Sequence, residues 1–238
     1  MRGYYTLAGR TVEIESIYPR VHDYWKDYKS SGSGEAAPDI TVRISSADIE
    51  FEKGRSEHAS PNDYLEELAV YRKVCEKMVS FDTFLFHASC VVRDGEAYMF
   101  AAPSGTGKST HAALWCRAFE DAYVLNDDKP LIYASESDER AVVYGTPYCG
   151  KHRRGINSSA PLKAFCIVTR GEENSIRKME QSEAFPFLMR QTYRPSDRIL
   201  LQETLVLLER ALSRSEIYML KCNMDIEAAY TAYEGMKG

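Results

Sequence analysis

The stretch AAPSGTGKSTHAALW, residues 101–115, decides the fold class of this chain. It follows the GxxxxGK[ST] pattern, with Ala102 at the first glycine position. Glycines inside such a loop let the backbone curl so that successive amide hydrogens face phosphate oxygens, and a helix starting at Lys108 adds its positive end. We expect Lys108 to neutralise the terminal phosphates and Ser109 to ligate Mg²⁺. The predicted phosphate-binding residues are Ser104, Gly105, Thr106, Gly107, Lys108, Ser109 and Thr110.

The flanking sequence has the strand–loop–helix order that this motif requires. FLFHASCVV (84–92) and EAYMFAA (96–102) have the composition of buried strands joined by a tight turn, and a helix is predicted over about 108–119. Leu114 and Trp115 on that helix are expected to pack against the sheet. Further helices are predicted over about 181–191, about 197–212 and from about 225 onward, with apolar strands between them. The alternation predicts an α/β protein.

An acidic pair follows the next apolar strand, AYVLN (122–126). Asp127 lies about 19 residues after Lys108, and a triphosphate site needs a carboxylate at a strand end to hold its metal ion. We therefore assign Asp127 to the metal, and Asp128 to accepting a proton from a hydroxyl, although the order of these two roles is open. The alternative is a simple turn, because Asn and Asp favour turns.

Three segments together resemble a known family: HASC (87–90), APSGTGKSTH (102–111) and NDDKP (126–130). They are similar to the HPr kinase/phosphorylases and their smaller relatives, whose nucleotide-binding core is shared with phosphoenolpyruvate carboxykinases. The resemblance covers about residues 80–170 and is weaker at GTPYCGK (145–151). It implies a carboxykinase-like P-loop core with a mixed sheet, and an ATP- and Mg²⁺-dependent kinase that phosphorylates a hydroxyl.

The resemblance also implies roles for single residues. Asp128 would take the proton of a seryl hydroxyl, and His87 would tune Asp128, whereas the residues alone leave His87 equally open to being a core histidine. In the basic run 151–154, Arg153 is our candidate for stabilising transferred phosphate, and a solvated surface loop is the equal alternative. The acceptor is a hydroxyl of a protein, peptide or small molecule. Two other functions stay open: a nucleotide-binding regulator without phosphotransfer, and a carboxykinase-related small-molecule enzyme.

We expect the chain to divide into a small β-rich portion with one helix (1–79), packed on an HPr kinase-like nucleotide-binding core (80–238). A hairpin broken at Gly9 is predicted over 4–17, a flexible loop over 30–39 and a strand over 40–51. Ser60 and Pro61 predict a helix start, with Ser60 as the cap.

Composition restricts the partners and the compartment. The net charge of −5 argues against binding nucleic acid through phosphates, and six cysteines without CxxC spacing indicate reduced thiols. No segment approaches the roughly 20 apolar residues that span a bilayer. We therefore expect a cytoplasmic protein that binds neither nucleic acid nor membrane, with its oligomeric state left open.

Overall fold

The computed structural model describes residues 1–30, 37–56 and 58–238. The chain separates into two compact units, Met1–Phe81 and Asp82–Gly238. The loop predicted over 30–39 falls mostly on residues 31–36, which lie outside the described residues.

The first unit is built on a three-stranded sheet in the order β1-β2-β3. Strands β1 (Arg2–Leu7) and β2 (Arg10–Glu15) form an antiparallel hairpin through Ala8 and Gly9, both of which have positive φ angles, of 47° and 73°. Such a turn matches the twist of paired strands, so the predicted hairpin is confirmed. Strand β3 (Ile40–Arg43) pairs parallel to β2. The helical elements are α1 (Arg20–Tyr24), η1 (Lys26–Tyr28), α2 (Ser46–Arg55), α3 (Asn62–Met78) and η2 (Val79–Phe81).

Two predictions for this unit are wrong. Residues 46–51 are helical rather than extended, because Asp48 accepts hydrogen bonds from the backbone amide and the hydroxyl of Ser45 and so completes a capping box. Ser60 does not cap α3: its hydroxyl lies 3.5 Å from the carbonyl oxygen of His58, and Pro61 is the N-cap without a side-chain hydrogen bond. The described part of this unit contains the α-helices α1, α2 and α3, where the sequence predicted one helix.

The second unit is a mixed α/β structure around a nine-stranded mixed sheet. Strands β6, β10 and β12 are parallel, and the other pairs are antiparallel. The main path is β4 (Thr83–Leu85), β8 (Leu131–Tyr133), β9 (Val142–Tyr144), β10 (Ser159–Arg170), β6 (Glu96–Ala101), β5 (Ser89–Arg93) and β7 (Tyr123–Asn126); β12 (Glu216–Cys222) pairs with β10, and β11 (Ser175–Lys178) with β12. Because β10 lies between β6 and β12, the carboxyl ends of three parallel strands meet at one edge, where ligands bind in open α/β sheets.

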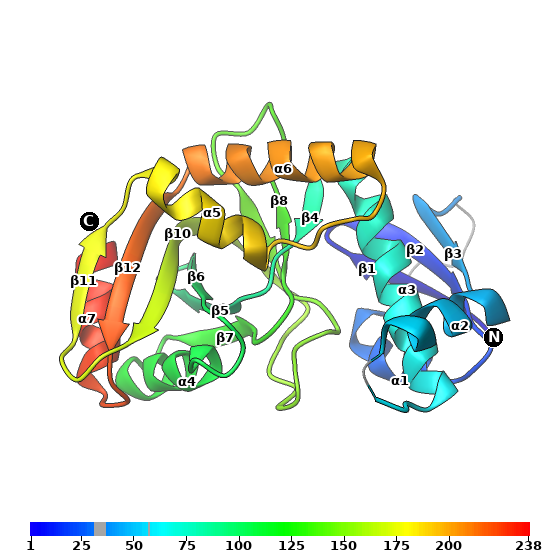
Figure 1. Cartoon of the computed structure of the whole chain (residues 1–238), viewed down its shortest axis with the longest axis horizontal. Helices are drawn as coiled ribbons and strands as arrows, with labels where there is room; N and C mark the ends of the chain where they lie inside the picture. Colours follow the sequence, from blue (N-terminus) through cyan, green and yellow to red (C-terminus); the bar gives the residue numbers. More distant parts are fainter. Residues whose placement is uncertain (31–36, 57) are drawn as a thin grey trace. The chain divides into compact units, whose positions relative to one another are not determined.

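Helices cover both faces of this sheet (Figure 1). Helices α4 (Lys108–Ala118) and α7 (Glu227–Met236) pack together on one face, and α5 (Gln181–Gln191) and α6 (Arg198–Ser213) lie on the other. The core under α4 is aromatic: the Trp115 ring lies 4.9 Å from Tyr98 and 5.3 Å from Phe100, between centroids. Trp115 and Leu114 are buried in this core, as predicted, and their packing fixes α4 against the end of β6.

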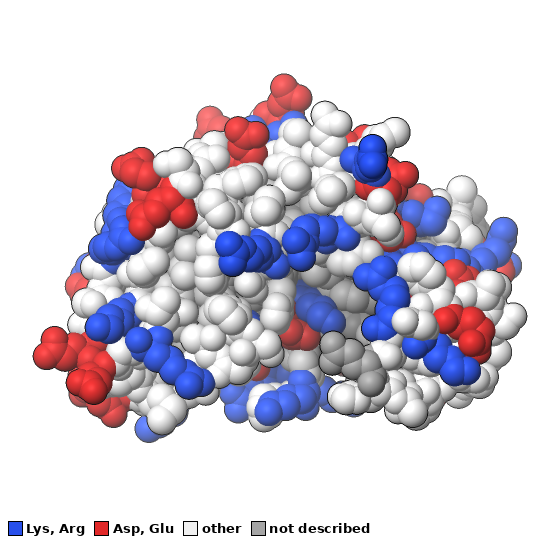
Figure 2. All heavy atoms as spheres, viewed as in Figure 1, with Lys and Arg blue, Asp and Glu red and all other residues white. Residues whose placement is uncertain are grey.

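Over α5 and α6, Figure 2 shows basic side chains scattered among acidic and uncharged ones rather than forming one continuous band.

All six cysteines are free thiols, and each lies within the described ranges. Among the helices of the described chain, none has the length and apolar character needed to cross a membrane.

Candidate functional site

The loop between β6 and α4, residues 102–107, is called here the glycine loop. Gly105 and Gly107 have φ angles of +77° and +123°, a region that side-chain-bearing residues rarely adopt. A Cβ atom at either position would meet nothing within 4 Å, so backbone conformation rather than crowding requires glycine there. Gly107 is also the N-cap of α4, and no side chain caps that helix. The first amide hydrogens of α4 therefore lack helical acceptors.

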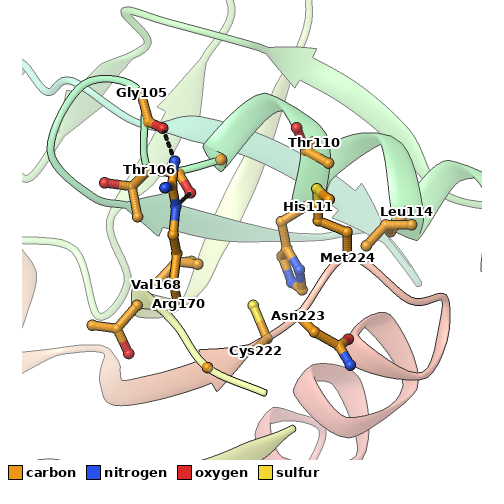
Figure 3. A pocket seen from close by; sticks show the side chains of 13 residues that line it. Gly105, Thr106, Thr110, His111, Leu114, Val168, Arg170, Cys222, Asn223 and Met224 are labelled. Atoms are coloured by element: carbon orange, nitrogen blue, oxygen red, sulfur yellow. Dashed lines mark hydrogen bonds between the residues drawn. The ribbon is translucent and has the colours of Figure 1, made fainter. Parts of the chain in front are cut away.

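Arg170, at the end of β10, holds the glycine loop from one side. Its guanidinium donates to the carbonyl oxygens of Gly105, at 2.6 Å, and Thr106, at 3.2 Å (Figure 3). In a planar trans peptide the carbonyl and the following N–H point in opposite directions. Fixing the Thr106 carbonyl toward Arg170 therefore turns the Gly107 amide hydrogen away from Arg170.

A cavity of about 510 Å³, called here the loop cavity, opens at the glycine loop. It is lined by His87, Ser104, Gly105, Gly107, Lys108, Ser109, Thr110, Asp127, Asp128, Gly150, Lys151 and His152. Lys108 is 8% exposed and its ammonium donates to the carbonyl oxygen of Ala102 at 2.9 Å. Burial lowers the pKa of Lys108, and the Asp128 and Asp127 charges act in the opposite direction.

The acidic pair lies at the end of β7, and the two carboxyl groups have different surroundings. Asp127 is 6% exposed, and its Oδ1 accepts a hydrogen bond of 2.7 Å from the Ser89 hydroxyl. The Asp128 side chain is 28% exposed. Buried Asn126 stabilises the turn that carries both aspartates. Its Oδ1 accepts a hydrogen bond from the Asp128 amide at 3.0 Å, and its Nδ2 donates hydrogen bonds to Thr146. Both aspartates line the loop cavity, Asp127 as a buried and hydrogen-bonded carboxylate and Asp128 as a partly exposed one.

His87 contacts Asp128 directly. It lies between β4 and β5, its amide donates to the Gln191 carbonyl, and its Nε2 is 3.3 Å from Asp128 Oδ1. Burial acts to raise the pKa of Asp128, but the hydrogen bond with His87 and the positive charges of Lys129, His87 and Lys108 hold that pKa below its ordinary value. Gly150 packs against this carboxylate: a Cβ atom there would lie 3.2 Å from Asp128 Cβ. Asp128 is therefore ionised near neutral pH in a confined position.

The structure brings together most, but not all, of the residues singled out in the sequence. Within the basic run, Lys151 and His152 line the loop cavity, whereas exposed Arg153, with a φ angle of 50°, stands outside the lining. Thr106 is also outside it, turned with its carbonyl toward Arg170.

Three supporting residues were missed by sequence reasoning: Ser89, Asn126 and Arg170. Ser89 and Asn126 stand inside motifs that the sequence singles out, but the pairing of β5 with β7 brings Ser89 to Asp127, and the fold brings Thr146 to Asn126 from 20 residues away. Arg170 had one usable signal, since an arginine followed by Gly171 ends a long apolar strand at the carboxyl edge of a sheet. Only the pairing of β10 with β6 places it beside the glycine loop.

Comparisons with known proteins match the chain to a family and to solved structures. No curated protein matches the chain. The solved structure of the HPr(Ser) kinase/phosphatase from Coxiella burnetii aligns with 65% of this chain and 99% of that chain, at 9% sequence identity and a TM-score of 0.35. The sequence profile described as "SynChlorMet cassette protein ScmC" matches residues 62–225, which is more than half of the chain. The chain therefore belongs to the ScmC family of SynChlorMet cassette proteins.

Proposed function

We propose that this chain is an ATP- and Mg²⁺-dependent phosphotransferase that transfers the γ-phosphoryl group to a hydroxyl, foremost a serine hydroxyl of a protein, peptide or small molecule. One observation carries the proposal: a single cavity gathers a glycine loop with its lysine, a buried carboxylate and an accessible aspartate–histidine pair. Phosphoryl transfer needs positioning and charge neutralisation more than covalent chemistry, and these are the groups that supply both.

The glycine loop and Lys108 are suited to holding the triphosphate. The Lys108 ammonium donates a hydrogen bond to the Ala102 carbonyl. A phosphate oxygen is charged and makes a stronger hydrogen bond with an ammonium than a neutral carbonyl does, so ATP is expected to draw Lys108 off Ala102. The free amides at the start of α4 favour the same anion. Arg170 contributes by keeping the loop carbonyls turned away from the phosphates.

Asp127 and Ser109 fit the ligands of a magnesium ion. Ser89 occupies Asp127 Oδ1, and no described residue donates a hydrogen bond to Oδ2. Mg²⁺ prefers oxygen ligands and is usually held by one or two protein groups together with substrate phosphates. A magnesium ion held there would neutralise negative charge on the phosphates. Ser89 is then a positioning residue that fixes which Asp127 oxygen faces the cavity.

Asp128 and His87 are suited to the acceptor hydroxyl. The acceptor oxygen bonds to the γ-phosphorus, the bond from that phosphorus to the bridging oxygen of ADP breaks, and Asp128 takes the hydroxyl proton. A carboxylate with a lowered pKa is a weak base, but the loose transition state of phosphoryl transfer asks for little activation of the nucleophile. The His87 hydrogen bond keeps the carboxylate ionised and fixes its orientation.

The test is transfer of label from γ-labelled ATP with Mg²⁺ to acceptors in a cell lysate, with mass spectrometry of the labelled product. Asp128→Asn is compared with Asp138→Asn, a matched change in an exposed turn away from the cavity. We expect transfer by the wild type and the control, and a loss of about 100-fold or more in Asp128→Asn with ATP binding retained.

Equal transfer by Asp128→Asn would contradict the assigned base. ATP binding without transfer by any of the three proteins would instead favour the nucleotide-binding regulator. We expect Lys108→Met to lose ATP binding whether the protein is a phosphotransferase or a nucleotide-binding regulator. Unchanged ATP binding in that variant would contradict the assignment of the phosphate site.

A further inference from the structure

The basic run 151–154 contributes two residues to the lining of the loop cavity. Lys151 and His152 belong to that lining, whereas Arg153 and Arg154 stand outside it. Lys151 is exposed, and across residues 1–30, 37–56 and 58–238 no ion pair or hydrogen bond engages its ammonium. The function proposed above gives this lysine no role, although it stands in the same cavity as the acidic pair.

The chain around Lys151 is attached to both aspartates of that pair. On one side, a Cβ atom at Gly150 would lie 3.2 Å from Asp128 Cβ, so the residue before Lys151 packs against this side chain. On the other side, the carbonyl oxygen of Arg154 accepts a hydrogen bond of 3.0 Å from the Asp127 amide. A lysine ammonium is carried on a flexible four-carbon stem. The Lys151 ammonium can therefore turn into the space in front of Asp128 while its backbone stays in place.

The charges in the proposed reaction favour a cation at this place. The γ-phosphoryl group and the Asp128 carboxylate, both negative, approach the acceptor oxygen from different sides. Their repulsion increases as the phosphoryl group moves toward the acceptor, because like charges repel more strongly at a shorter distance. Lys108 stands at the glycine loop, with its ammonium on the Ala102 carbonyl. Lys151 is the other lysine of the cavity lining, and it stands next to the residue that packs on Asp128.

We propose that Lys151 is a catalytic residue whose ammonium contacts the γ-phosphoryl oxygens while the group is transferred. The inference rests on the proposed function, because it adds a residue to that same reaction. Lys151 keeps its proton throughout, and the proton of the acceptor hydroxyl goes to Asp128. The contact forms as the phosphoryl group leaves ADP and moves toward Asp128. Lys151 therefore stabilises the transition state more than it stabilises bound ATP, and it takes the role that the sequence assigned to Arg153.

The test compares the full-length wild type with Lys151→Met and Lys151→Arg in the presence of Mg²⁺. Calorimetry measures the Kd for ATP and the Kd for ADP with aluminium fluoride, which imitates the planar phosphoryl group during transfer. The rate of label transfer from γ-labelled ATP to the lysate acceptors is measured in parallel. Lys237→Met removes an exposed lysine at the end of α7, outside the cavity lining, and is the matched control.

We expect Lys151→Met to bind ATP as the wild type does, which also shows that the variant is folded. Its complex with ADP and aluminium fluoride should be weaker by about 100- to 1,000-fold, and its transfer slower by a similar factor, because one charged donor to the transition state is lost. Lys151→Arg keeps the positive charge and should recover most of both losses. Lys237→Met should match the wild type in all three measurements.

Three results would overturn the role of Lys151. The first is a Lys151→Met variant that binds the mimic and transfers label as the wild type does. The second is slower transfer with unchanged binding of the mimic, because the lysine would then act on the acceptor. The third is equal weakening of ATP and of the mimic, which is the signature of uniform nucleotide binding.

The two proposals fail in different ways. Transfer by the wild type, with equal transfer by Lys151→Met, overturns the role of Lys151 and leaves the phosphotransferase standing. A wild type that transfers no label and does not bind ADP with aluminium fluoride overturns both.

Discussion

Acidification should destabilise the second unit through His111, because this imidazole is buried in its neutral form. Its pKa of about 4 in the folded protein lies below its ordinary value of 6.5. Between these two pKa values the unfolded chain binds a proton that the folded protein does not bind. The contribution of the neutral ring to the unfolding free energy is therefore fully present above pH 6.5 and is lost as the pH falls toward 4. Protonation would also place a hydrogen on Nε2, directly opposite the Trp115 N–H.

The magnitude follows from these two pKa values. At about pH 5 the unfolded histidine is almost fully protonated and the folded one is only about one-tenth protonated, which corresponds to a loss of about 2 kcal/mol relative to about pH 8. The full gap of about 2.5 pH units corresponds to about 3 kcal/mol below both pKa values. Because the side chain is 2% exposed, solvent screening does not reduce this figure appreciably.

Urea unfolding followed by tryptophan emission measures the effect in the wild type and in His111→Phe. Carboxylates and the other histidines titrate in both proteins, so the difference between the two proteins isolates His111. Between about pH 8 and about pH 5, the wild type should lose about 2 kcal/mol more unfolding free energy than His111→Phe. Parallel losses in the two proteins would refute the buried neutral ring.

Three further outcomes are expected. Gly107→Ala should lower the free energy of unfolding by about 1–3 kcal/mol and weaken ATP binding, because a φ of +123° strains any residue other than glycine. The control Gly54→Ala, inside α2 with open space and no positive φ, should raise the free energy of unfolding by about 0.5–1 kcal/mol. Destabilisation by both substitutions would contradict the role given to the positive φ. Arg170→Met should raise the Kd for ATP by about tenfold without unfolding the protein, since it releases two loop carbonyls, and an unchanged Kd would show that the loop holds itself. His87→Phe should raise the pKa of Asp128, followed by carbon NMR of the carboxyl group, because it removes the hydrogen bond and positive charge that favour ionisation; a lower pKa would be inconsistent with the contact.

Short-range patterns predicted the elements that depend on neighbouring residues. The helix predicted over about 108–119 is α4 at Lys108–Ala118, and those predicted over about 181–191 and about 197–212 are α5 and α6. The strand prediction for 46–51 failed because apolar alternation competed with a capping box that acts over only three residues. Local hydrogen bonding prevailed over the alternation there.

The sequence by itself determined the glycine loop, since positive φ angles at Gly105 and Gly107 and the helix that follows are properties of consecutive residues. It also placed an acidic pair at a strand end. Only the tertiary structure decided what surrounds them: Arg170 reaches the loop across 64 residues, and Ser89 reaches Asp127 across 38. Such contacts follow from strand pairing and burial, which join residues distant in sequence and leave no periodic trace in it. The tertiary structure also decides that Nδ1 of His111 has no hydrogen-bond partner, because this depends on the residues packed around the ring.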